Sequence, residues 1–165
     1  MKRAICLLLC CLSLLLCFGC AEKEPEVQEG LRFYYPAAQL SYQPGSSAID
    51  SESRILDEQA DLAQILNIYF LGPEAEHLLS PFPAGLRIVK TAIEDKTVYI
   101  TVSDHLTELS GLELTMVCGC LTLTTLELTG AETVVINAKD ALLDGQKSIT
   151  MDKNTLLLTD IWQEE

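Results

Sequence analysis

The strongest constraint on the fold lies in the middle of the chain, where two apolar runs are separated by only three polar residues. The first run covers residues 86–93 and the second covers residues 97–102. In the second run the apolar residues Val98, Ile100 and Val102 alternate with Thr and Tyr, so one strand face is apolar and the other is half polar. This pattern predicts a β-hairpin that rests one face on a hydrophobic core.

Two further segments have the apolar spacing and punctuation of helices. In residues 54–71 the apolar positions recur near a period of 3.6, acidic residues stand in the first turn, and Gly72-Pro73 follows the end. A second helix is predicted after Ser110, which opens a Ser-x-x-Glu capping-box pattern, and it ends near Gly130. Residues 121–128 in its tail are rich in Thr and partly alternate, a pattern that also suits a strand; we favour the helix.

The remaining predicted elements are short. Residues 31–35 have strand composition before Pro36, and residues 133–137 have it again. Residues 37–53 indicate a long loop or a ragged strand pair, and residues 147–160 have room for a last hairpin. The order β-α-β-β-α-β, with two helices covering one face of a small mixed sheet, predicts an α+β sandwich.

The N-terminus has the pattern of a secretory signal. Met1-Lys2-Arg3 is a short positive region, and the uncharged apolar run over residues 4–18 is too short for a comfortable transmembrane helix. The ending Cys17-Phe18-Gly19-Cys20 resembles a bacterial lipobox, although Cys17 stands where Leu is usual. We therefore expect residues 1–19 to be a lipoprotein signal peptide and Cys20 to carry the lipid; a plain secreted protein or an uncleaved anchor is the alternative.

The charge of the chain bears on its partners. There are 11 Lys and Arg residues against 24 Asp and Glu residues, for a net charge of −13, and cleavage leaves 146 residues near −15. Nucleic-acid binding needs a basic face, so we expect no nucleic-acid partner. Anionic headgroups repel an acidic domain, so the lipid alone attaches it to the extracytoplasmic face of the cell membrane, and residues 20–30 act as an acidic tether.

Cysteines supply no predicted disulfide or metal site. Five of the seven lie in the leader or at the lipid site, which leaves Cys118 and Cys120. A bridge between residues two apart in a helix would be strained, and a lone Cys-x-Cys offers too few metal ligands. We expect two buried, unreactive thiols.

The two histidines are the other candidates for chemistry. His105 follows Asp104 and lies near Glu108, which suggests an acid/base pair, but a polar loop after a strand explains it as well. His77, among acidic residues, would need metal ligands from elsewhere. The sequence has no Gly-rich phosphate loop and no Gly-x-Ser-x-Gly elbow. We therefore predict no catalytic residue, no metal and no cofactor, and a protein that is not an enzyme.

Aromatic and acidic residues suggest surfaces rather than chemistry. In the run Phe33-Tyr34-Tyr35, alternating strand faces bury at least one ring, and the others are candidates for contact with a partner or a glycan. Trp162, the only Trp, either docks the C-terminal tail onto the domain or anchors an interaction. Acidic residues in the tether and at Glu164-Glu165 suggest a surface for a cation or a basic partner, but spread charge without calcium-loop spacing is more typical of a solvated surface.

Several short motifs together resemble the GerMN domain of sporulation and germination lipoproteins. The most specific piece is a Leu-Gly-Pro followed by Ser-Pro-x-Pro-x-Gly, after which a hairpin and a helix closing on Gly follow in the same order. The chain departs from the family at Glu94-Asp95-Lys96, where an Asp-Gly turn is usual, and at Thr129, where Pro often precedes the Gly. The residues are Leu71-Gly72-Pro73, Ser80-Pro81-Phe82-Pro83-Ala84-Gly85, Val102-Ser103, Leu128-Thr129-Gly130 and Val134-Val135-Ile136.

The resemblance implies a GerMN-like domain over residues 31–145, similar to ring-building modules of secretion-like assemblies, and a C-terminal extension over residues 146–165. It implies action through protein contact outside the membrane, with no catalytic residue to carry over. We expect a membrane-anchored lipoprotein that binds an envelope protein or itself in an envelope or sporulation-associated assembly. The alternative is a lipoprotein that binds a small molecule or cell-wall fragment in a concave pocket; a hydrolase is the third hypothesis.

Overall fold

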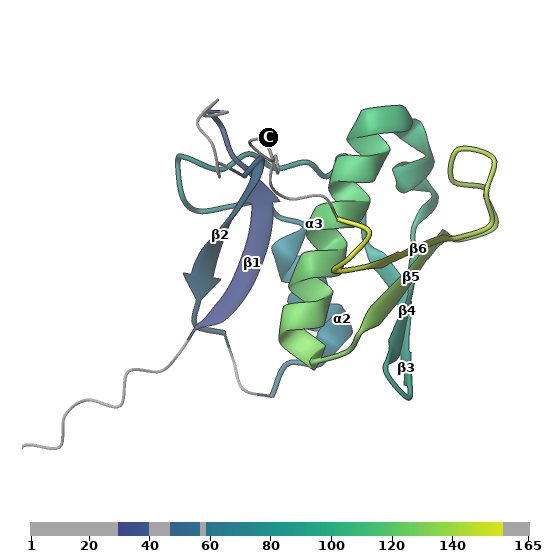
Figure 1. The fold of residues 1–165 in the computed structure, drawn as a ribbon, viewed down its shortest axis with the longest axis horizontal. Helices are drawn as coiled ribbons and strands as arrows, with labels where there is room; N and C mark the ends of the chain where they lie inside the picture. The colour runs from purple at the N-terminus through teal and green to yellow at the C-terminus, as the bar shows by residue number, and fades with distance from the viewer. Residues whose placement is uncertain (1–29, 40–46, 57–58, 157–165) are drawn as a thin grey trace, which may run out of the picture.

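The computed structural model describes residues 30–39, 47–56 and 59–156 (Figure 1). The predicted signal peptide, Cys20, nearly all of the tether, and Trp162 lie outside these residues. The predicted α+β class with a mixed sheet is confirmed. In chain order the elements are β1 (Leu31–Pro36), β2 (Ile49–Arg54), α2 (Leu62–Tyr69), β3 (Ile88–Glu94), β4 (Thr97–Val102), the 3-10 helix η2 (Asp104–Glu108), α3 (Gly111–Thr129), β5 (Thr133–Ala138) and β6 (Ile149–Asp152).

The main sheet has the strand order β3-β4-β5-β6. β3 and β4 pair antiparallel, which confirms the predicted hairpin. β4 and β5 are parallel neighbours, and parallel strands need a crossover, which η2 and α3 supply. β6 pairs antiparallel with β5 and lies in the segment for which a last hairpin was predicted. A returning strand would lie after residue 156, outside the described residues.

β1 and β2 form a second, separate sheet of two strands. The predicted first strand therefore does not join the main sheet, and the segment expected to be a loop or a ragged strand pair supplies β2. Figure 1 shows α3 between the two sheets, and the helix contacts β1 on one side and β5 and β6 on the other. The backbone N–H of Tyr34 donates to Thr124 Oγ1 over 3.0 Å, so β1 is bonded to the helix.

The central helix α3 is covered around its circumference. Every residue from 117 to 126 is buried, as expected of a helix that is apolar on all sides. The Thr-rich tail that also suited a strand is therefore helical, and Gly130 ends the helix with φ +67° as predicted. The Ser110 side chain makes no capping hydrogen bond. Among the described residues α3 alone is long and apolar enough to cross a membrane, but here it is a core helix.

The predicted helix over residues 54–71 is shorter in the structure, where α2 begins at Leu62. Asp61 supplies a capping box, since its side chain accepts from the Gln64 N–H over 2.8 Å and the Gln64 side chain accepts from the Asp61 N–H over 3.0 Å. Arg54 belongs to β2, and Ile55, which extended the apolar pattern toward the N-terminus, is 69% exposed.

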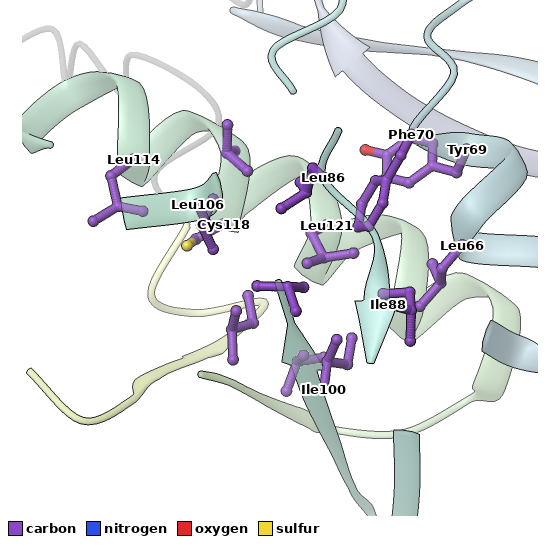
Figure 2. Close-up of a cluster of buried hydrophobic side chains, with 14 of the residues drawn as sticks. Leu66, Tyr69, Phe70, Leu86, Ile88, Ile100, Leu106, Leu114, Cys118 and Leu121 are labelled. Atoms are coloured by element: carbon purple, nitrogen blue, oxygen red, sulfur yellow. The ribbon is translucent and has the colours of Figure 1, made fainter. Parts of the chain in front are cut away.

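The core lies between the helices and the inner face of the main sheet. Figure 2 shows Leu66 of α2, Leu121 of α3 and Ile88 and Ile100 of the hairpin converging on one another. Both helices thus pack on the same face of the sheet, as the sequence predicted.

Three buried threonines of α3 differ in how their hydroxyls are satisfied. Thr124 Oγ1 accepts the hydrogen bond from Tyr34. Thr122 Oγ1 and Thr125 Oγ1 are buried and have no hydrogen-bond partner within the part of the chain that the structure describes. A buried polar group without a partner destabilises the folded state.

Replacing these threonines one at a time by valine, which keeps the shape and removes the hydroxyl, is expected to give opposite results. Thr125→Val should raise the free energy of unfolding by about 1 kcal/mol, whereas Thr124→Val should lower it by about 1–2 kcal/mol because Tyr34 loses its acceptor. Urea denaturation of the two variants measures this difference. Equal changes in both variants would contradict the assignment of the hydrogen bond.

Candidate functional site

An open, mainly apolar groove lies between the proline-rich loop, residues 80–85, and the start of α3. Its volume is about 450 Å³, which is within the size range of ligand and side-chain pockets. Ser80 and Glu113 are the polar members of its lining, and Glu113 alone is charged. The lining consists of Ser80, Pro81, Phe82, Pro83, Leu109, Leu112, Glu113 and Met116.

The proline-rich loop is held in place by its own backbone. Pro81 and Pro83 cannot donate to a neighbouring strand, so the loop stays outside the sheets. Gly85 takes φ +81°, and a side chain there would meet the ring of His105 at 3.0 Å. On the N-terminal side, the Leu79 N–H donates to the Pro36 carbonyl over 2.9 Å. The loop is therefore fixed at both ends.

Phe82 joins the groove to an aromatic cluster beneath it. Its ring lies 4.7 Å from Tyr69 and 4.8 Å from Phe70, measured between ring centroids. Tyr35 lies farther away, at 6.2 Å. Edge-to-face packing of this kind is favourable and directional, so Phe82, the one aromatic side chain in the lining of the groove, is held in place by buried rings.

The opposite wall comes from the first turns of α3. Leu112 is 78% exposed and lines the apolar recess. Met116, one turn further on, is half-buried and adds a flexible thioether that adapts to different shapes. The arrangement suits an apolar side chain from another segment better than a polar small molecule.

A buried ion pair supports the aromatic cluster from below. The guanidinium of Arg54 lies 5.4 Å from the centre of the Phe33 ring, and its Nη2 donates to the Gly72 carbonyl over 2.6 Å and to the Tyr35 hydroxyl over 3.2 Å. Arg54 Nε donates to Glu52 over 2.7 Å. The pair thus ties β2 to the cluster and to the turn after α2.

Glu52 fixes the same turn through backbone hydrogen bonds. Its carboxylate accepts from the N–H groups of Ala75 over 2.8 Å and Glu74 over 3.1 Å. Burial by itself would raise the pKa of Glu52, but the Ala75 and Glu74 hydrogen bonds and Arg54 together lower that pKa below its ordinary value. Burial raises the pKa of Tyr35 and of Tyr69, so both phenols stay protonated.

The structure does not assemble a catalytic centre around the predicted histidines. Ser103 Oγ lies 3.3 Å and Asp104 Oδ1 lies 3.6 Å from the same atom, His105 Nδ1, whereas a Ser-His-Asp triad uses the two different ring nitrogens. Ser103 is also buried. His77 is exposed, and its Nε2 lies 3.8 Å from Asp50. Within the described ranges, no group of three or more His, Cys, Asp or Glu side chains can hold a metal ion.

The remaining sequence candidates are mostly buried. Cys118 and Cys120 are free and buried, as predicted, and burial raises the pKa of each thiol to about 12. Phe33 and Tyr35 point into the core and Tyr34 is half-buried, so these rings do not form an exposed aromatic patch together.

Sequence reasoning did not identify the groove as a site. In the sequence the proline-rich loop is a break between regular elements and part of the family resemblance, while Leu112 and Met116 fit the pattern of a helix. The available signal was an apolar residue, Leu112, directly after Ser110-Gly111 at a helix start, where polar residues are usual.

Comparison with known proteins adds no relative: no protein-family model, no curated protein and no solved structure matches this chain. The fold and the groove define its class, an α+β domain with an open apolar groove at one end of its central helix.

Removing the charge of Glu52 is expected to destabilise the domain. Glu52→Gln leaves Arg54 buried without its close counter-charge, which should lower the free energy of unfolding at pH 7 by about 3 kcal/mol. Because the folded-state pKa of Glu52 is lowered, its stabilising contribution is present above the unfolded pKa of about 4.3 and is lost as the pH falls through the folded pKa. Denaturant titrations at several pH values test this, and the variant should lack that part of the acid dependence.

Glu74→Gln is the matched control for this experiment. The Glu74 side chain is 79% exposed and lies 3.7 Å from Arg54, so its loss should change the free energy of unfolding by less than about 1 kcal/mol. Equal effects of the two substitutions would show that the buried pair does not support the fold as described.

Proposed function

We propose that this protein is a lipid-anchored, extracytoplasmic lipoprotein that acts by protein–protein contact, without catalysis or a cofactor. The observation that carries the contact is the groove, where Leu112 is exposed beside an apolar, aromatic floor. Exposed apolar recesses in otherwise charged proteins are typical of interaction sites. The partner would insert an apolar side chain between the proline-rich loop and α3.

Charge favours a partner segment that carries Lys or Arg beside its apolar anchor. Glu113 lines the groove, and the chain as a whole has a net charge of −13. Opposite charges on a partner speed association and disfavour acidic competitors. Binding should therefore weaken as the salt concentration rises.

The cellular location and the kind of assembly that we propose for this contact are supported by the sequence. The lipobox-like ending at Cys20 supports attachment to the outer face of the cell membrane. The resemblance to GerMN domains supports an envelope or sporulation-associated assembly, with an envelope protein or a second copy as partner.

Substituting Leu112 should remove the partner without harming the fold, because its side chain is largely exposed. We expect crosslinking in intact cells, followed by detergent extraction and mass spectrometry, to recover a reproducible envelope partner. Leu112→Asp should reduce the yield about tenfold, which corresponds to 1.4 kcal/mol of binding free energy.

Ile93→Asp is the matched control, because Ile93 is 57% exposed and lies on the β3–β4 hairpin, far from the groove. The turn of this hairpin is near the C-terminal end of α3, where the Glu132 N–H donates to the Lys96 carbonyl over 2.8 Å. Ile93→Asp should leave the yield unchanged. Recovery of no partner in growing or sporulating cells would contradict the proposal and favour a small-molecule or cell-wall ligand.

Membrane attachment is expected to depend on a single cysteine. Cys20→Ala should abolish lipid labelling and leave the leader uncleaved, since the acylated thiol is missing. Cys17→Ala, three residues earlier in the leader, should keep both the lipid labelling and the cleavage of the leader. Metabolic labelling with a fatty acid and the mass of the mature chain provide the measurement, and a labelled Cys20→Ala protein would disprove the assignment.

A further inference from the structure

One line of residues along α3 joins the groove to the middle of the helix. Leu112, Met116 and Gly119 are spaced by four and three residues, so they share one face of the helix. Leu112 and Met116 line the groove. Gly119 lies two turns further along, about 10 Å from Leu112 at 1.5 Å per residue.

The chain that leaves β6 runs onto this same face. Asp152 pairs with Thr133, close to the C-terminal end of α3. The Asp152 carboxylate then accepts from the N–H groups of Asn154 and Thr155, both over 2.8 Å, and reverses the chain. Leu156 follows and packs on Gly119, where an added Cβ would lie 3.1 Å from Leu156 Cδ2.

The direction of this return leads toward the groove. Between Asp152 and Leu156 the chain passes from the end of α3 to its middle, and Met116 and Leu112 lie beyond Gly119 in that same direction. Trp162 is six residues beyond Leu156. Six extended residues span about 20 Å, twice the distance that must be covered.

We propose that residues 157–165 continue along this face and that Trp162 occupies the groove of its own molecule. The groove has the volume and the apolar lining for an indole, with the Phe82 ring as its floor and the Met116 thioether beside it. If the groove also receives a partner, as proposed above, the partner must displace this segment, and that consequence rests on the proposed function.

The effect of salt concentration distinguishes docking of the C-terminal tail from binding of a partner. Asp160, Glu164 and Glu165 flank Trp162, and Glu113 lines the groove, so like charges oppose the intramolecular contact. Screening by salt should strengthen docking of the tail, whereas it should weaken binding of a basic partner.

Because Trp162 is the only Trp, its fluorescence reports directly on the contact. The experiment uses the full chain reconstituted in phospholipid vesicles without any partner. We expect emission typical of a buried indole, protected from iodide and independent of protein concentration. Leu112→Asp should shift the emission to longer wavelength and increase quenching several-fold, and Ile93→Asp should leave both unchanged. Circular dichroism shows that each variant is folded.

Three results would overturn this inference. They are emission from a solvent-exposed indole in the unmodified chain, buried emission that does not respond to Leu112→Asp, as for insertion into the lipid, and burial that disappears on dilution, as for exchange between two copies. The readout is independent of the partner. If Leu112→Asp loses the crosslinks but Trp162 is exposed in the unmodified chain, the proposed function stands without this inference. If Trp162 is docked but no partner is recovered, this inference stands without the proposed function.

Discussion

The rest of the structure depends on the burial of α3 from both sides. A helix whose apolar residues surround its whole circumference cannot be stable at the edge of a domain, because some apolar face would always meet water. The four-stranded sheet covers one side, and the small β1–β2 sheet covers the other. Since α3 is also the crossover between the parallel strands β4 and β5, its cover holds both sheets in one domain. The hydrogen bond from Tyr34 to Thr124 crosses the contact between helix and strand.

The groove forms where this cover ends. Burial of α3 begins in full at Val117, so the first turns of the helix project beyond the sheets. The proline-rich loop approaches them there, and its Phe82 rests on aromatic rings from β1 and α2. The Glu52–Arg54 pair fixes the turn after α2 beneath that cluster. An apolar surface is thus kept open by rigid neighbours, which lowers the entropic cost of binding.

Local patterns predicted most elements but not their extents or partners. The alternation in β4 identified the hairpin because half of its side chains face the core. β2 escaped clear prediction because Ile49-Asp50-Ser51-Glu52-Ser53-Arg54 is polar, and pairing with β1 rather than apolar alternation makes it a strand. For α2, the exposed Ile55 extended a periodic pattern into residues that the Asp61 capping box excludes from the helix. Cys118 and Cys120 are buried as expected, because free thiols behave as small apolar groups and these two lie on the fully covered part of α3.

The sequence by itself determined the α+β class, the hairpin, the end of α3 at Gly130 and the acidic character of the chain, because these depend on residue spacing and composition over short ranges. Only the tertiary structure decided that β1 leaves the main sheet, that Arg54 pairs with Glu52 inside the protein, and that Phe82, Leu112 and Met116 share one groove. The three groove residues are up to 34 positions apart, and their proximity follows from how the buried helix and its two covering sheets pack, which no local pattern records.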